Sequence, residues 1–192
     1  MNEKNDILDN GFFPTARDLM RAAVGKTLVS WSDDSDPAPD GTTAAFQVVR
    51  FDFDGLRLFA KTSPWDPPSD AKSHVNRTEI LDEPAWRALV EANPDDVDKG
   101  YVPAEWKTHP VGRAVTAVTL FTDVKTNWHR HDDGHLTVTH DACAVAFHFD
   151  GGVLVAEKKN AWSDFWQVGV QTASEPRLCG ERAPGSLVAE RL

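Results

Sequence analysis

The stretch FQVVRFDFDGLRLFA, residues 46–60, decides the fold class. Apolar and polar residues alternate up to Phe53, and an apolar–polar alternation resumes after Asp54-Gly55. An Asp-Gly pair between two alternating segments is the strongest short-range signal for two antiparallel strands joined by a two-residue turn. The stretch therefore predicts a β-hairpin.

The turn also predicts which residues face each other across the hairpin. With Asp54-Gly55 as the two turn residues, Phe53 lies opposite Leu56 on one face of the hairpin. Asp52 lies opposite Arg57 on the other face, where opposite charges stabilise a cross-strand pair. The apolar face is expected to pack on the core and the charged face to meet solvent.

A second hairpin is predicted over residues 142–157, where VAFHFDG at 145–151 resembles VRFDFDG at 49–55. Strand residues alternate up to Phe149, and apolar residues return at Val153. Two explanations of the likeness stay open. One is an internal duplication, and the other is two independent hairpins that share a common turn.

Two helices and two further strands complete the prediction. A helix over 15–24 is expected to be capped by Thr15, and a second over 83–92 by Asp82. The segment 114–122 is apolar on both faces, which indicates a central strand, and 166–171 alternates as a half-exposed strand.

Together these elements predict an α+β fold. Its mainly antiparallel sheet is built from two β-hairpins, with two or more short helices packed on it. Residues 1–192 are expected to form a single domain, in which 176–192 is a loosely packed C-terminal tail.

Composition and charge narrow the classes of function. The 192-residue chain carries 30 acidic and 20 basic side chains, a net charge of -10, so its average field repels phosphate backbones and anionic lipid. No apolar stretch approaches the roughly 20 residues that cross a bilayer. With only two cysteines, the chain is expected to be a cytoplasmic protein with no disulfide framework. Nucleic acid and membrane are therefore not expected as direct partners.

Several tryptophans are followed closely by aspartates in segments predicted to be loops. Aromatic anchors rimmed by carboxylates suit the surface of a basic protein, although large aromatics also pack at the edge of a core. The residues predicted to bind such a partner are Trp31, Asp33, Asp34, Asp36, Trp65, Asp132 and Asp133.

Histidines gather in one short segment, since four of the seven lie between positions 129 and 140. On a strand, His129 and His131 share a face, and a turn at Gly134 brings His135 or Asp133 round as a third ligand. This spacing predicts a site for zinc or another divalent transition metal. The alternative is a solvated loop whose histidines contact water and nearby aspartates.

The leading functional prediction is a non-enzymatic acidic domain that binds a basic protein, of the inhibitor or immunity-protein type, and that needs no cofactor. The first alternative is a metal-dependent enzyme that uses His129, His131 and His135. The second is a structural or scaffold subunit. The sequence leaves the oligomeric state open.

Overall fold

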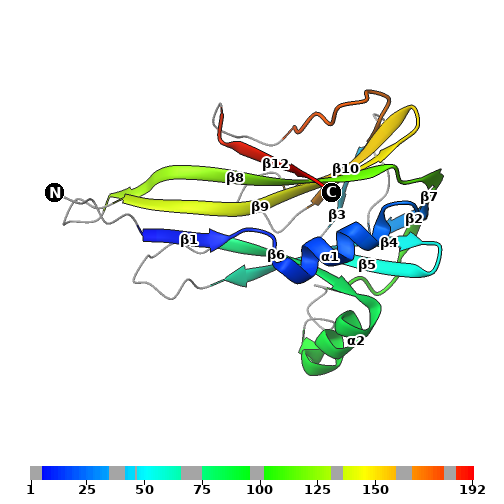
Figure 1. The fold of residues 1–192 in the computed structure, drawn as a ribbon. Coiled ribbons are helices and arrows are strands. Elements are labelled where there is room, and N and C mark those ends of the chain that lie inside the picture. Colours follow the sequence, from blue (N-terminus) through cyan, green and yellow to red (C-terminus); the bar gives the residue numbers. More distant parts are fainter. Residues whose placement is uncertain are drawn as a thin grey trace.

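The protein folds as two β-sheets that lie face to face, with two helices among the described residues (Figure 1). The computed structural model describes residues 6–34, 42–45, 47–65, 75–95, 102–130, 136–158, 166–179 and 185–192.

The larger sheet, sheet A, has seven strands within these residues, and its longest strands form the upper layer in Figure 1. Its strands run in the order β12 (Leu187–Arg191), β8 (Ala117–Arg130), β9 (Leu136–Phe149), β10 (Gly152–Lys158), β11 (Trp166–Gln171) and β3 (Thr42–Ala45), and β1 (Asp6–Asn10) also pairs with β9. The β1–β9 pair is parallel, and the remaining pairs of the sheet are antiparallel.

The second sheet, sheet B, has five antiparallel strands and forms the lower layer. Its order is β6 (Val75–Asp82), β5 (Leu56–Trp65), β4 (Val48–Phe53), β2 (Thr27–Asp33) and β7 (Lys107–Ala114). The predominantly antiparallel α+β architecture predicted from the sequence is therefore confirmed.

The first predicted hairpin is strands β4 and β5, in the predicted register. Phe53 pairs with Leu56, and Asp52 pairs with Arg57. Gly55 has a φ of 70°, a value that glycine adopts without the steric cost that a side chain would add. The Asp-Gly turn therefore forms as the sequence predicts.

The second predicted hairpin is strands β9 and β10, in which Phe149 pairs with Gly152. The two hairpins lie in different sheets and face each other across the core, where the rings of Phe51 and Phe147 are 4.9 Å apart. An internal duplication stays a prediction.

Both predicted helices are present. Helix α2 (Glu83–Ala92) has the predicted bounds and cap, because the Asp82 carboxylate accepts a hydrogen bond from the Ala85 N–H. Helix α1 (Pro14–Ala23) begins one residue earlier than expected, and the predicted Thr15 cap is wrong. Pro14 takes the first helical position, where its fixed φ suits a helix and its missing N–H costs no bond.

The main core lies between the sheets and is apolar over most of its length. Its largest fully buried side chains include those of Trp166, Phe51 and Phe147. A second cluster lies on the outer face of sheet B, where α2 packs and the rings of Phe59 and Trp86 stack at 4.6 Å. Sheet B is therefore covered on both faces where α2 packs on it.

Some predicted boundaries differ from the structure. The central strand predicted over 114–122 begins at Ala117 and continues to Arg130. Part of the predicted tail 176–192 forms β12, which pairs with β8. Cys143 is buried, and its Sγ donates to the Phe121 carbonyl at 3.2 Å. Among the described residues, no helix is long and apolar enough to cross a membrane.

Candidate functional site

The predicted binding residues at the end of β2 are packed inside the protein. Trp31 is only 5% exposed and stacks on the His109 ring, with 4.0 Å between ring centroids. Asp33 is fully buried, and its Oδ1 lies 3.4 Å from His109 Nε2. Asp34 is half-buried. Trp31 and Asp33 thus help to join β2 to β7 and take no part in an exposed surface.

The other predicted site residues lie wholly or partly outside the described part of the chain. Asp36, Asp132, Asp133, His131 and His135 are outside it. The backbones of Trp65 and His129 belong to strands β5 and β8, while their side chains are outside it. No group of three metal-binding side chains occurs among the described residues. The binding and metal roles of these residues stay predictions.

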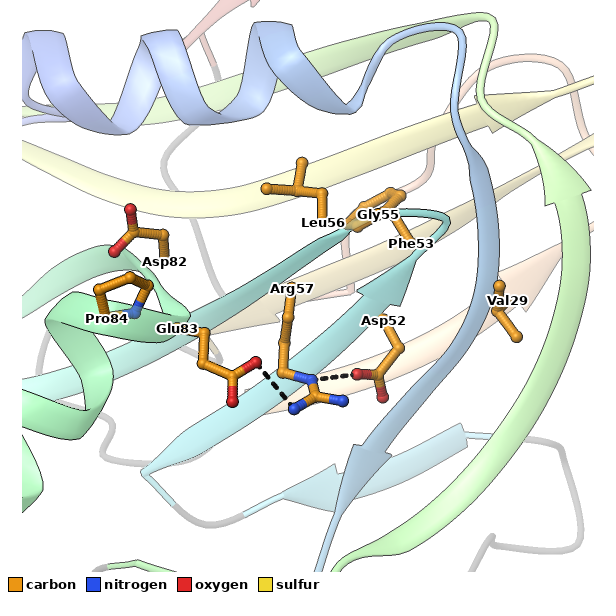
Figure 2. Close-up of a pocket in the computed structure, with 9 residues that line it drawn as sticks. All are labelled: Val29, Asp52, Phe53, Gly55, Leu56, Arg57, Asp82, Glu83 and Pro84. Carbon is orange, nitrogen blue, oxygen red and sulfur yellow. Dashed lines mark hydrogen bonds and ion pairs between the residues drawn. The ribbon is translucent and has the colours of Figure 1, made fainter.

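An open pocket lies beside the tip of the β4–β5 hairpin, and we call it the hairpin pocket (Figure 2). It has a volume of about 580 Å³ and is bordered by the hairpin turn, by the first turn of α2 and by one residue of β2. Its lining residues are Val29, Asp52, Phe53, Gly55, Leu56, Arg57, Asp82, Glu83 and Pro84.

The pocket exists because β5 extends further than the neighbouring strand β6 at this edge of sheet B. Strand β6 stops at Asp82, opposite Leu58, so the first two residues of β5, Leu56 and Arg57, extend beyond it. At this point the chain leaves β6 and enters α2, whose first turn forms one wall. On the opposite side, a register irregularity in β2 leaves Val29 50% exposed.

Arg57 occupies the middle of the hairpin pocket and bonds to two carboxylates, as Figure 2 shows. Its Nε lies 2.5 Å from Asp52 Oδ1, and its Nη1 lies 2.9 Å from Glu83 Oε2. The hydrogen bond to Asp52 is the largest of the effects that raise the pKa of Arg57, and Glu83 adds to it. The guanidinium therefore keeps both carboxylates in place and stays charged.

Two flanking arginines extend this ionic chain. Arg50 Nε lies 2.9 Å from Asp52 Oδ2, and its guanidinium stands over the Trp106 ring, 4.9 Å from the centroid. Arg87 forms an ion pair with Glu83 one turn along α2. Asp52 and Glu83 thus each have two arginine partners, which fixes the carboxylates and reduces their local field.

Asp82 contributes a third carboxylate to the hairpin pocket. Its Oδ1 accepts the capping bond from the Ala85 N–H at 3.0 Å, a bond that does not use Oδ2. A carboxylate oxygen has more than one lone pair, so Asp82 can accept further hydrogen bonds from a bound cation. The lining side chains therefore include three carboxylates and one guanidinium.

A second pocket adjoins the first at Asp82 and lies between α1 and the end of β6; we call it the helix pocket. It has a volume of about 530 Å³. Leu19, Ile80 and Leu81 line it together with Thr15, Asp18, Asp82 and Ala85. Mainly apolar side chains thus form the helix pocket, whereas three carboxylates and one guanidinium line the hairpin pocket.

The sequence predicted several parts of this site but not the site itself. The Asp52–Arg57 pair and the Asp82 cap followed from local patterns. The register between β5 and β6 brings the ion pair and the cap together, because it places Asp82, the last residue of β6, opposite Leu58. This register depends on residues far apart in the sequence. The sequence offered one indication of the pocket: its three acidic residues, Asp52, Asp82 and Glu83, lie close to the predicted hairpin turn or to the predicted start of a helix.

No family model, curated protein or solved structure matches this chain.

Proposed function

We propose that this chain is a non-enzymatic acidic domain that binds a basic protein partner, in the manner of an inhibitor or immunity protein, and that the hairpin pocket is its binding site. One observation carries the proposal: among the described residues, Asp52, Asp82 and Glu83 line the pocket together with one cation, Arg57, and the pocket also exposes Val29. A lysine or arginine side chain, with its charged tip and apolar stem, matches such a lining.

The positions of the carboxylates support binding of an incoming cation. The side chains of Asp52 and Glu83 are 18% and 30% exposed, so both are partly withdrawn from water yet reachable from the pocket. Asp82 lies on the α2 side of the same space. The partner's cation would bond to Asp82 directly and share the outer carboxylate oxygens with Arg57.

The overall charge has a different role from the pocket. Because Arg50, Arg57 and Arg87 offset the local carboxylates, the pocket supplies geometry more than a strong field. The net charge of -10 supplies the long-range attraction that steers a basic protein towards the chain. The association rate would therefore depend mainly on the net charge of the chain, and the choice of partner would depend mainly on the geometry of the hairpin pocket.

The helix pocket gives the partner a second point of contact. Its lining by Leu19, Ile80 and Leu81 suits an apolar side chain, and it adjoins the cation site at Asp82. A partner segment with a basic residue and an apolar residue close together would engage both pockets. Burial of such an apolar anchor stabilises complexes more than exposed ion pairs do.

The test uses the full chain and short fluorescent peptides in which one lysine or arginine lies next to one leucine, with glutamate in place of the basic residue as the peptide control. Asp82→Asn removes a charge but keeps the helix cap, since asparagine caps as well as aspartate. Glu175→Gln is the matched control. It also removes one negative charge, at an exposed position that follows β11 of sheet A.

We expect the basic peptides to bind in preference to the acidic ones. Asp82→Asn should weaken binding by up to about fivefold, as for one partly exposed charge pair, and Glu175→Gln should leave it nearly unchanged. Equal effects of the two substitutions would show that only net charge matters. No preference for basic peptides would refute the proposal.

A further inference from the structure

The outer face of sheet A is covered by the segment 172–179, which follows β11 and which we call the strap (orange coil in Figure 1). Leu178 of the strap packs against an apolar cluster on this face. The cluster consists of Phe121, Cys143, Ala144, Ala146, Val153 and Val155. Three of these side chains are small, which lets an extended segment approach the sheet closely.

Hydrogen bonds hold the second half of the strap. The side chain of Gln171, the last residue of β11, donates to the Arg177 carbonyl at 2.7 Å and accepts from the Arg177 N–H at 2.8 Å. At its end, the Cys179 N–H donates to Glu157 Oε1 at 2.8 Å. Glu157 is only 4% exposed, so this contact lies against the sheet. The strap is therefore a docked part of the fold.

His148 of β9 lies beneath the strap and is only 6% exposed. Its Nε2 lies 2.8 Å from Thr119 Oγ1 of β8, and the ring also shares a hydrogen bond with the backbone of Ser174 in the strap. Arg191 of β12 pairs with Thr119, and its cation acts electrostatically on the ring. The imidazole thus connects the strap to β9 and β8.

The surroundings of His148 favour its neutral form. Burial is the largest effect and lowers the pKa of His148, and the Arg191 cation lowers it further, while the Ser174 contact raises it in part. The cross-strand neighbours of His148 are the uncharged Ala117 and Val153. The charged strap residues, Glu175 and Arg177, are both exposed. Among the described residues, the charge that acts on the ring is therefore that of Arg191.

We propose that His148 is a proton-operated latch for the strap: the strap packs closed over the neutral ring, and protonation of this buried ring releases it and uncovers the apolar face of sheet A. The added proton places a charge on a ring that is only 6% exposed and that lies in the field of the Arg191 cation, and this cost outweighs the gain in the Ser174 bond. Opening of the strap lets water solvate that charge. The latch is distinct from the hairpin pocket, which lies on sheet B.

The direction of the pH effect follows from the two states. In the open state the ring has its ordinary pKa near 6.5, and in the closed state its pKa is lower. The closed state is therefore fully stabilised above about pH 6.5 and loses stability as the pH falls below that value. Because one proton is involved, the opening constant should rise by at most about tenfold per pH unit.

Hydrogen–deuterium exchange of the full chain tests the latch. After correction for the intrinsic exchange rate, amides of the strap should lose protection as the pH falls from about 8 to about 5. Peptides from α2 should not change. A second readout is the labelling ratio of two cysteines, since Cys143 is buried under the strap and Cys179 is exposed. The Cys143 to Cys179 ratio should rise over the same range.

Two substitutions decide whether His148 is responsible. His148→Gln keeps a polar side chain but cannot take up the proton, so strap protection should become independent of pH. Arg191→Gln removes the neighbouring cation, so the loss of protection should be smaller than in the natural chain; it also serves if His148→Gln does not fold. Strap protection that is constant with pH in the natural chain, or that falls equally in all three proteins, would overturn the latch.

Discussion

Lys158 Nζ lies 2.8 Å from Asp141 Oδ1, and neither side chain reaches solvent: Lys158 is 0% exposed and Asp141 is 1% exposed. The ammonium also donates to the carbonyl of Asn76, which belongs to β6 in the other sheet. Asn10 donates to the same Asp141 oxygen and to the same carbonyl. One buried ion pair thus connects strands β1, β6, β9 and β10 and joins the two sheets.

Replacing only the cation of this pair should be strongly destabilising. Lys158→Met keeps the volume and the apolar stem but leaves Asp141 as a buried charge without its ammonium. Removal of one partner of a buried pair typically costs about 3–5 kcal/mol. Urea denaturation would measure the loss. Lys26→Met, at a surface position, should change stability by less than about 0.5 kcal/mol; equal effects would contradict the role of the pair.

The β4–β5 turn supplies a prediction about backbone conformation. A Cβ added at Gly55 would contact nothing within 4 Å, but φ there is 70°. Gly55→Val should therefore lower the free energy of unfolding by about 1 kcal/mol or more through strain alone. Gly55→Asn should cost less, because asparagine tolerates this region. Similar denaturation midpoints for the natural chain and Gly55→Val would refute the strain.

Local features of the fold were predictable because they depend on neighbours in the sequence. The hairpin register followed from Asp54-Gly55, and the start of α2 followed from Asp82. The buried pair was not predictable, although Lys158 continues the inward alternation of Leu154 and Ala156. Its partner Asp141 is 17 residues away along the chain, and the contact to Asn76 spans 82 residues.

The burial of Trp31 and Asp33 also depends on residues far away in the sequence, and the sequence pattern did not predict it. The segment after Trp31 was predicted to be a loop, whereas β2 continues through Asp33 between two neighbouring strands. That position buries Ser32 and Asp33 on both faces of sheet B. Aspartates that appear solvated in the sequence can thus be internal when a sheet closes over them, and only the pairing of β2 with β7 reveals it.

The cap of α2 can be tested separately from its charge. Asp82→Ala removes the bond to the Ala85 N–H and should destabilise the protein by about 1 kcal/mol. Asp82→Asn should retain nearly full stability because the amide oxygen can accept the same bond. Thermal denaturation of both variants would measure the difference. Equal loss in the two would mean that the charge, and not the cap, stabilises the helix.

Metal analysis separates the proposed function from the enzyme alternative. The proposed binding needs no metal, so the chain purified without a histidine tag should keep less than a stoichiometric amount of zinc, iron or manganese through dialysis. A stoichiometric metal that is lost in the double variant His129→Ala and His131→Ala would instead favour the predicted metal site. Circular dichroism of that variant checks that its fold is unchanged.

The proposed binding mode predicts that charge and apolar contact act on different rate constants. Long-range attraction by the net charge of -10 should speed association with a basic partner and weaken as salt is raised, because the Debye length falls from about 30 Å at 0.01 M to about 8 Å at 0.15 M. In stopped-flow experiments, the association rate constant of a peptide that contains lysine or arginine next to leucine should therefore fall as salt is raised over this range.

Two substitutions in the hairpin pocket separate the effects further. Asp82→Asn should lower the association rate constant, and Val29→Ser, at a side chain that is 50% exposed, should mainly raise the dissociation rate constant by removing apolar contact. Val29→Ser should leave stability nearly unchanged, because the side chain is half in water already. If neither substitution alters either rate constant, the partner binds elsewhere and the hairpin pocket is not its site.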